Sequence, residues 1–329
     1  MAYKLLTAQQ LFEKYETKLG DTSDHLWGQH IRTESVTYFV GETSVGKTTF
    51  LYNLCLRLSR GEAFLNIAPP RPLRILHIDY ESSGSNCVEA LWNIGHNSPN
   101  WILIDLDDAV DNGEGIHGPP MMRFLESIKP YEYDMLIVDP LMEAYPVSDE
   151  NNNVEATAQM LAFRKIARTK KMGVVVVHNT GKAFVNPKTK QEQSSTERAS
   201  RKFLGRGAAA RQDKADVGIN YVSVDDTTRI ARVVKSRTSN LGTQWTLSFD
   251  GNHGLAVREV SQVPSAIECQ TGPDDTLALG TILDAHAGES LKTVYELHIK
   301  DQLNMSRRTF FRKLQLIRAQ RVTPVISSE

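Results

Sequence analysis

The sequence has little cysteine and no metal-binding cysteine pattern. It contains 3 cysteines in 329 residues, and they stand far apart, with no CxxC pair and no histidine cluster at zinc spacing. A disulfide framework and a structural zinc site are therefore excluded as organising features. We expect the three thiols to be reduced and buried.

Long apolar runs and an excess of charge of one sign are also lacking. No segment approaches the ~18 consecutive apolar residues of a membrane-spanning helix, and the start, MAYKLLTAQQLFEKYETK, has no basic segment followed by an apolar one. Lys+Arg 38 against Asp+Glu 39 give a net charge of −1, so any contact with nucleic acid must be local. We therefore expect a cytoplasmic protein without a membrane partner.

What the sequence does contain is a series of β-branched runs that alternate with helical stretches. The strand-like runs lie at 36–40, 74–80, 101–106, 134–139 and 174–178, and the helical stretches lie at 48–60, 87–94, 121–128 and 154–171. Near-continuous apolar strands separated by amphipathic helices are typical of a parallel sheet that is covered on both faces. The pattern predicts an α/β fold with a doubly wound, mainly parallel sheet.

Later β-like runs predict an antiparallel extension of this sheet. They lie at 217–224, 229–237 and 243–249 and are joined by turn-like segments. An amphipathic helix is expected over residues 4–19, before the sheet. The predicted organisation is an N-terminal helical segment (1–35), the α/β domain (36–262), a linker (263–275) and a small helical domain (276–329).

A phosphate-binding motif stands between the first strand and the first helix of the sheet. Residues 41–48, GETSVGKT, fit GxxxxGK(S/T). Its glycines let backbone N–H groups face phosphate oxygens, and the following helix adds the positive end of its dipole. We expect Lys47 to reach the β- and γ-phosphates of ATP and Thr48 to ligate Mg²⁺. The predicted contacts are Gly41, Glu42, Thr43, Ser44, Val45, Gly46, Lys47, Thr48 and Thr49.

Acidic residues end two further strands. Asp139 closes DMLIVD at the carboxyl end of a strand, where such sheets open their ligand crevice and a carboxylate can hold Mg²⁺. Asp79 and Glu81 end RILHIDYE on the same side of the pleat. Hydrolysis needs a group that orients or deprotonates water. Glu81 is the predicted base, Asp79 is the alternative, and a structural role for the pair is a third possibility.

In their order, these motifs resemble the RecA-fold ATPases and, within them, the plasmid RepA-type hexameric replicative helicases. The resemblance covers residues 36–250. It implies that the second acid of the IDYE segment is catalytic, which supports Glu81. It also implies that His178, which ends the strand VVVVH, senses the γ-phosphate. Many relatives carry a second histidine where this chain has Asn179, so either residue is a candidate sensor.

Two later segments resemble other motifs of that family. FLGRGAAARQ is similar to the RGSxA segment, and its Arg206 is assigned to the nucleotide site. VVKSRTSNLG is similar to the KxRxG hairpin, which implies that Lys235 and Arg237 enter the ATP site of a neighbouring subunit as arginine-finger-type groups. Its tip, 238–240, is longer than in many relatives. The resemblance thus implies a homo-oligomer, in the form of a hexameric ring.

Basic residues gather in the polar loop 181–203. Long loops inside compact domains are usually functional, and in RecA-like rings the equivalent loop grips single-stranded DNA through its phosphates. Few aromatic residues accompany the charges, so contact without sequence readout is expected. A merely solubilising loop is the alternative. The candidate DNA contacts are Lys182, Lys188, Lys190, Arg198, Arg201 and Lys202.

A second basic segment lies near the end of the sequence. Residues 305–328 contain no acidic residue, and NMSRRTFFRKL resembles the recognition helix of a winged helix-turn-helix. It would contact duplex DNA or a protein partner through Arg307, Arg308 and Arg312. A basic surface helix without a partner is the alternative.

Three functions are compatible with these features, and the order of motifs favours the first. It is a ring-shaped, ATP-driven DNA helicase or translocase that serves replication of a plasmid, phage or mobile element. The second is a RecA-like recombination mediator or regulatory ATPase that binds DNA without unwinding it. The third is a switch or defence ATPase whose C-terminal module binds a protein.

Overall fold

The computed structural model describes two compact units, 1–263 and 264–329. The described residues are 7–10, 23–82, 84–95, 98–104, 117–180, 194–201, 205, 207, 209–237, 241–249, 255–262, 279 and 281–285. In the second unit they include a helical segment at 281–285. The predicted recognition helix, with Arg307, Arg308 and Arg312, lies outside the described residues.

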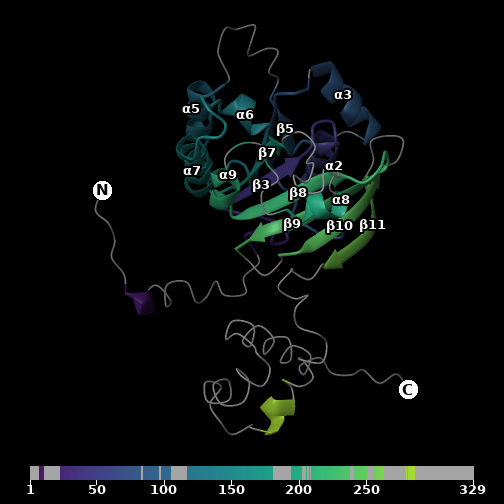
Figure 1. The fold of residues 1–329 in the computed structure, drawn as a ribbon. Helices are drawn as coiled ribbons and strands as arrows, with labels where there is room; N and C mark the ends of the chain where they lie inside the picture. The colour runs from purple at the N-terminus through teal and green to yellow at the C-terminus, as the bar shows by residue number, and fades with distance from the viewer. Residues whose placement is uncertain are drawn as a thin grey trace. The chain divides into compact units, whose positions relative to one another are not determined.

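A nine-stranded sheet forms the centre of the first unit (Figure 1). Its strands are β3 (Val36–Gly41), β4 (Ile75–Asp79), β5 (Trp101–Leu103), β6 (Met135–Asp139), β7 (Gly173–Asn179), β8 (Val217–Ser223), β9 (Thr228–Ser236), β10 (Thr243–Phe249) and β11 (Leu255–Gln262). Their order across the sheet is β11-β10-β9-β8-β3-β7-β6-β4-β5. Neighbours from β8 to β5 run parallel and those from β8 to β11 antiparallel. The predicted α/β fold with an antiparallel extension is confirmed.

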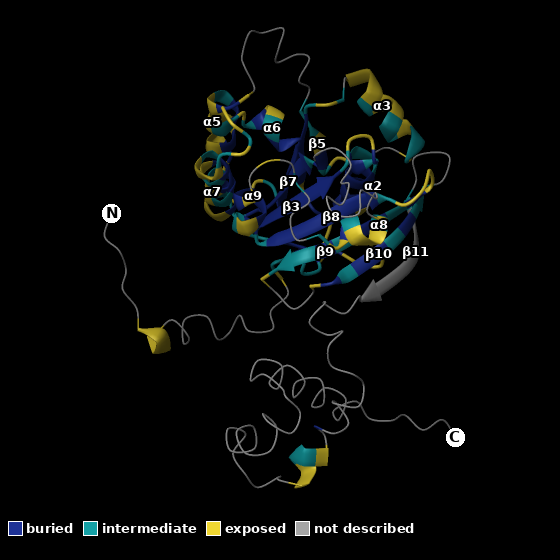
Figure 2. Ribbon diagram, viewed as in Figure 1, coloured by how far each residue is buried: buried dark blue, intermediate teal, exposed yellow. Residues whose placement is uncertain are grey.

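Helices cover both faces of the sheet. They are α2 (Lys47–Ser59), α3 (Gly84–Asn93), α5 (Pro119–Ser127), α6 (Leu141–Ala144), α7 (Asn153–Lys170), α8 (Ser195–Ala199) and α9 (Ala210–Lys214). Successive side chains of β3 enter different cores, with Phe39 packing on the α2 side and Tyr38 and Val40 on the α5 and α7 side. The central strands are buried on both faces (Figure 2), which explains their continuous apolar runs.

A small hairpin corrects the prediction that residues 1–35 are helical. Strands β1 (His25–Trp27) and β2 (Ile31–Arg32) pair antiparallel. Trp27 is buried, stacks on Trp245 with ring centroids 5.4 Å apart, and donates from Nε1 to the Phe64 carbonyl at 3.0 Å. Strands this short have no usable periodicity, so long-range packing alone determines them. Of the helix predicted over 4–19, only residues 7–10 are described, and 8–10 are helical.

A buried carboxylate joins the starts of β4 and β6. The Asp134 side chain is 7% exposed and accepts hydrogen bonds from Arg71 Nη2 at 2.7 Å and from the Arg74 backbone at 2.8 Å. Burial alone would raise its pKa, but the bonds from Arg71 and Arg74 outweigh burial and lower the pKa to about 2. The ionised form therefore stabilises the folded state above the unfolded pKa, and this contribution is lost as pH falls towards 2.

We expect Asp134→Asn to lower the free energy of unfolding at pH 7 by about 2 kcal/mol. The deficit should shrink as pH falls through about 4 to 2, because the wild-type carboxylate then becomes protonated. Urea unfolding over a pH series measures this. The control Glu126→Gln removes an exposed carboxylate that pairs with Lys165 and should change stability little. Equal stability of Asp134→Asn and wild type at pH 7 would contradict the expectation.

Candidate nucleotide site

Residues 41–48 form the loop between β3 and α2, as the motif predicts. Gly46 has a φ of 91°, and a Cβ there would lie 2.6 Å from Cζ of Phe249, so both conformation and space demand glycine. Among the described residues, no side chain caps the start of α2. Its first N–H groups and the positive end of its dipole are thus available to an anion such as phosphate.

The carboxyl ends of β4 and β6 bring two aspartates next to this loop. Asp79 and Asp139 are opposite one another in the strand register, and Thr48 Oγ1 donates to Asp139 Oδ2 at 3.1 Å. Asp139 is fully buried, and its Oδ1 has no hydrogen-bond partner within the described part of the chain. Burial, followed by the charges of Asp79 and Glu81, raises the pKa of Asp139. A hydrated Mg²⁺ would satisfy such an oxygen, so the residues fit the expected metal.

Lys47 lies buried in the loop and is held by the loop itself. Its Nζ donates to the Glu42 carbonyl at 2.9 Å. Burial lowers the pKa of Lys47, while the charges of Asp139, Glu81 and Glu42 oppose this shift. The ammonium group therefore lies among three acidic side chains. Triphosphate would supply the stronger anionic partner that this position lacks.

The two acids after β4 have different surroundings. Asp79 is buried, and it accepts hydrogen bonds from the Tyr52 hydroxyl at 2.8 Å and from the N–H groups of Glu81 and Ser82, each at 3.0 Å. These bonds fix the turn that follows the strand. Glu81 is exposed, yet its charge acts on both Lys47 and Asp139. The geometry favours Glu81 as the group that meets a water molecule and Asp79 as the residue that positions it.

The two candidate sensors at the end of β7 lie on different faces of the sheet. His178 is buried and stacks on Tyr38, with ring centroids 5.7 Å apart, on the face opposite α2. Asn179 pairs in register with Gly41, the first residue of the loop. Its Oδ1 is buried and, within the described residues, has no hydrogen-bond partner. Asn179 is therefore the better placed of the two to contact phosphate.

Arg198 lies at the nucleotide loop, whereas the sequence suggested a DNA contact. Its guanidinium forms an ion pair with the Glu42 carboxylate, and its side chain is 19% exposed. Arg201, at the end of the same helix, accepts a bond from Asn220 through its carbonyl at 2.7 Å. The other DNA-loop candidates, and Arg206 of the nucleotide-site prediction, lie outside the described residues. They are Lys182, Lys188, Lys190, Lys202 and Arg206.

Two residues of the antiparallel extension support the loop from outside the motif. Arg229 Nε donates to the Val45 carbonyl at 2.8 Å, and its guanidinium lies 4.8 Å from the ring centroid of Phe249. Phe249 in turn covers Gly46. Sequence reasoning missed both residues because nothing in their local pattern differs from an ordinary strand. Only the pairing of β9 with β10 brings them to the loop.

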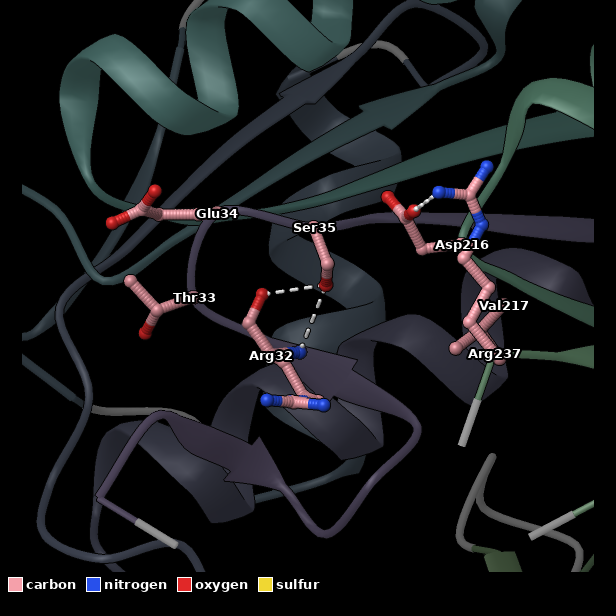
Figure 3. Close-up of a pocket in the computed structure, with 7 residues that line it drawn as sticks. All are labelled: Arg32, Thr33, Glu34, Ser35, Asp216, Val217 and Arg237. Carbon is pink, nitrogen blue, oxygen red and sulfur yellow. Dashed lines mark hydrogen bonds and ion pairs between the residues drawn. The ribbon is translucent and has the colours of Figure 1, made fainter. Parts of the chain in front are cut away.

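Lys235 and Arg237 lie at the opposite edge of the sheet from the loop. Val217 pairs with Thr37 in one direction and Ser236 in the other, so the end of β9 lies at the amino end of β3. Arg237 is exposed and pairs with Asp216 at 3.2 Å beside a cavity of about 220 Å³ (Figure 3). Burial, then the charge of Arg237, lowers the pKa of Lys235 to about 8.

The two cations at this edge differ in how they are held. Lys235 Nζ donates to the carbonyls of Gln212 and Asp213 at the end of α9, at 2.7 Å for Gln212. Lysine there also complements the negative end of the helix dipole. Arg237 extends from the end of β9 with half of its side chain exposed. Arg237 is thus the cation presented to the outside of the subunit.

Comparison with known proteins places this site in a family. The model of the AAA domain family (AAA_25) matches residues 4–184, more than half of the 329 residues. The chain belongs to the AAA domain family. A search of curated proteins gives no match. Within the part of this AAA domain protein that the structure describes, no helix is long and apolar enough to cross a bilayer.

Solved structures show the same fold. A solved helicase ATPase domain matches this AAA domain protein with a TM-score of 0.52 and 10% identity over 78% of this chain and 100% of that chain. The RadB recombinase matches with a TM-score of 0.43 and 15% identity over 68% of this chain and 90% of that chain. Sheet order, P-loop and family membership together identify a RecA-fold P-loop ATPase.

Proposed function

We propose that this ATPase is a RepA-type helicase or translocase that moves on single-stranded DNA as a ring and hydrolyses ATP between subunits. The observation that carries the proposal is the placement of the P-loop and Arg237 at opposite ends of β3. That strand has 6 residues and spans roughly 16 Å. Arg237 therefore cannot serve the P-loop of its own subunit, but it can serve that of a neighbour.

Within one subunit, each residue of the site has a distinct role in this proposal. Lys47 leaves the Glu42 carbonyl and binds the β- and γ-phosphates. Thr48 and Asp139 hold Mg²⁺, which supplies charge neutralisation across the β- and γ-phosphate oxygens when bound. Glu81 orients the attacking water or takes its proton. Asn179, in preference to His178, contacts the γ-phosphate.

The DNA part of the proposal depends on the sequence, because most of the basic loop 181–203 lies outside the described residues. Its cations suit phosphate contacts without base readout. One observation favours a second candidate, a RecA-like mediator or regulatory ATPase that does not unwind DNA. Arg198 is engaged with Glu42, which leaves one cation fewer for DNA. Replication of a plasmid, phage or mobile element is the process we propose for the first candidate.

Single-stranded DNA should stimulate steady-state ATP hydrolysis several-fold, and Lys47→Ala should lower the rate at least about 100-fold with or without DNA. Lys47 is the buried cation of the loop, so its loss leaves the phosphates without their main counter-charge. The measurement is phosphate release by the purified full chain. Lys165→Ala removes an exposed lysine of α7 and should behave as wild type. Turnover that depends on Lys47 but ignores DNA would contradict the motor and favour a switch with a protein partner.

A further inference from the structure

Helix α8 is held rigidly beside the P-loop. Its N-cap, Ser194, forms a full capping box with Glu197, in which each side chain bonds the backbone N–H of the other. Asn220 of β8 donates to the Ala199 carbonyl at 3.0 Å, so the end of the helix is tied to the sheet as well. A side chain on this helix therefore has a defined position relative to residues 41–48.

Arg198 uses that position to contact the loop. Its guanidinium pairs with the Glu42 carboxylate through Nη1 and donates from Nη2 to the Ser223 carbonyl at 3.2 Å. The Nε group is buried and, among the described residues, has no hydrogen-bond partner. Both charged side chains are mostly withdrawn from water, at 19% and 27% exposure. An ion pair of this burial is screened much less than a surface pair.

Glu42 poses an electrostatic problem for a loop that binds triphosphate. Its charge already acts on Lys47, together with those of Glu81 and Asp139. A carboxylate in the loop repels the incoming phosphates in a region of low effective dielectric. Arg198 is the cation that contacts this carboxylate. The pair as a whole is neutral, so the repulsion largely disappears while the pair is intact.

We propose that Arg198 is a positioning and charge-compensating residue of the nucleotide site, not a DNA contact. It neutralises Glu42 and fixes the first turn of the P-loop, so that the loop accepts ATP. The inference rests on the proposed function, since it assumes that triphosphate binds at residues 41–48. It makes the loss of Arg198 harmful only while Glu42 keeps its charge.

A double-mutant cycle tests this dependence. The measurement is equilibrium binding of the fluorescent nucleotide MANT-ATP, with Mg²⁺ and without DNA, to the full chain. Arg198→Ala should weaken binding roughly tenfold, because it leaves the Glu42 carboxylate unpaired beside the phosphates. Glu42→Gln should bind at least as tightly as wild type. The double variant Glu42→Gln/Arg198→Ala should return to within about threefold of wild type.

Two further measurements separate charge compensation from simple loss of structure. Arg168→Ala removes the same charge from an exposed position on α7 and should leave MANT-ATP binding unchanged. Thermal unfolding without nucleotide shows whether each variant folds. A folded double variant that binds as weakly as Arg198→Ala would overturn the inference, because removing the carboxylate would then bring no rescue.

The remaining outcomes distinguish the inference from the proposed function. If wild type does not bind MANT-ATP, the proposed nucleotide site itself is wrong. If wild type binds and Arg198→Ala binds equally well but loses affinity for an oligo(dT) strand, the site stands and Arg198 is a DNA contact after all. Rescue in the double variant supports both.

Discussion

Replacing Glu81 by glutamine should lower kcat for ATP hydrolysis by about 10²- to 10⁴-fold while ATP binding stays within about twofold of wild type. Glutamine keeps the size of the side chain but cannot accept a proton from water. Asp79 holds the backbone of Glu81 in place, so the substitution should not move the turn. Single-turnover hydrolysis and MANT-ATP binding, measured on the same preparation, separate the chemical step from affinity.

The neighbouring acids provide matched controls for this result. Glu143→Gln removes a carboxylate of α6 whose charge interacts with Glu81 and should change kcat less than about threefold. Asp79→Asn weakens the bonds to Tyr52 and to the turn, so it should lower thermal stability together with activity. If Glu81→Gln remained active and Asp79→Asn were inactive at unchanged stability, Asp79 would be the base.

Removing the exposed cation of β9 should have an effect of similar size, but across the subunit boundary. We expect Arg237→Ala to lower kcat by about 10³-fold or more, the range typical of arginine fingers, with little change in nucleotide affinity. Arg237 points out of its own subunit from the edge opposite the P-loop (Figure 3). Its effect should therefore be felt by the ATP of a neighbour.

Mixing two inactive variants tests this directly. A ring of Arg237→Ala and Lys47→Ala subunits contains interfaces at which an intact P-loop faces an intact Arg237, so ATP hydrolysis should reappear on mixing. Failure to recover activity in a confirmed mixed oligomer would contradict action between subunits. Arg168→Ala, which removes an exposed arginine far from both motifs in sequence, is the control and should keep wild-type turnover. Lys235→Ala tests separately whether the lysine held at α9 also contributes.

Much of the fold and of the site could be predicted from the sequence because both depend on local patterns. Strands buried on both faces must be apolar throughout, so β3, β6 and β7 were visible as runs. The P-loop depends on residues within eight positions, and Asp139 follows its strand directly. In a parallel sheet the carboxyl ends of the strands meet at one edge, which brings such residues together.

The parts that could not be predicted depend on contacts between distant segments. Arg198 and Glu42 are 156 positions apart, and no local pattern distinguishes an arginine that meets a P-loop from one that meets DNA. The choice between His178 and Asn179 needs the register of β7 on β3, since a shift of one residue exchanges the two faces. The hairpin of β1 and β2 depends on Trp27 stacking on Trp245.

The support of the P-loop by Arg229 and Phe249 has a consequence for what counts as the nucleotide-binding unit. The contact between Arg229 and Val45 joins residues 184 positions apart, so the loop acquires its shape when β9 and β10 fold, before any ligand arrives. The conformational entropy of the loop is thus lost on folding, and ATP meets a preorganised receptor. A fragment that ended at residue 184 would keep the whole motif yet lack this scaffold. The smallest piece of the chain that binds nucleotide with full affinity should therefore extend through β10.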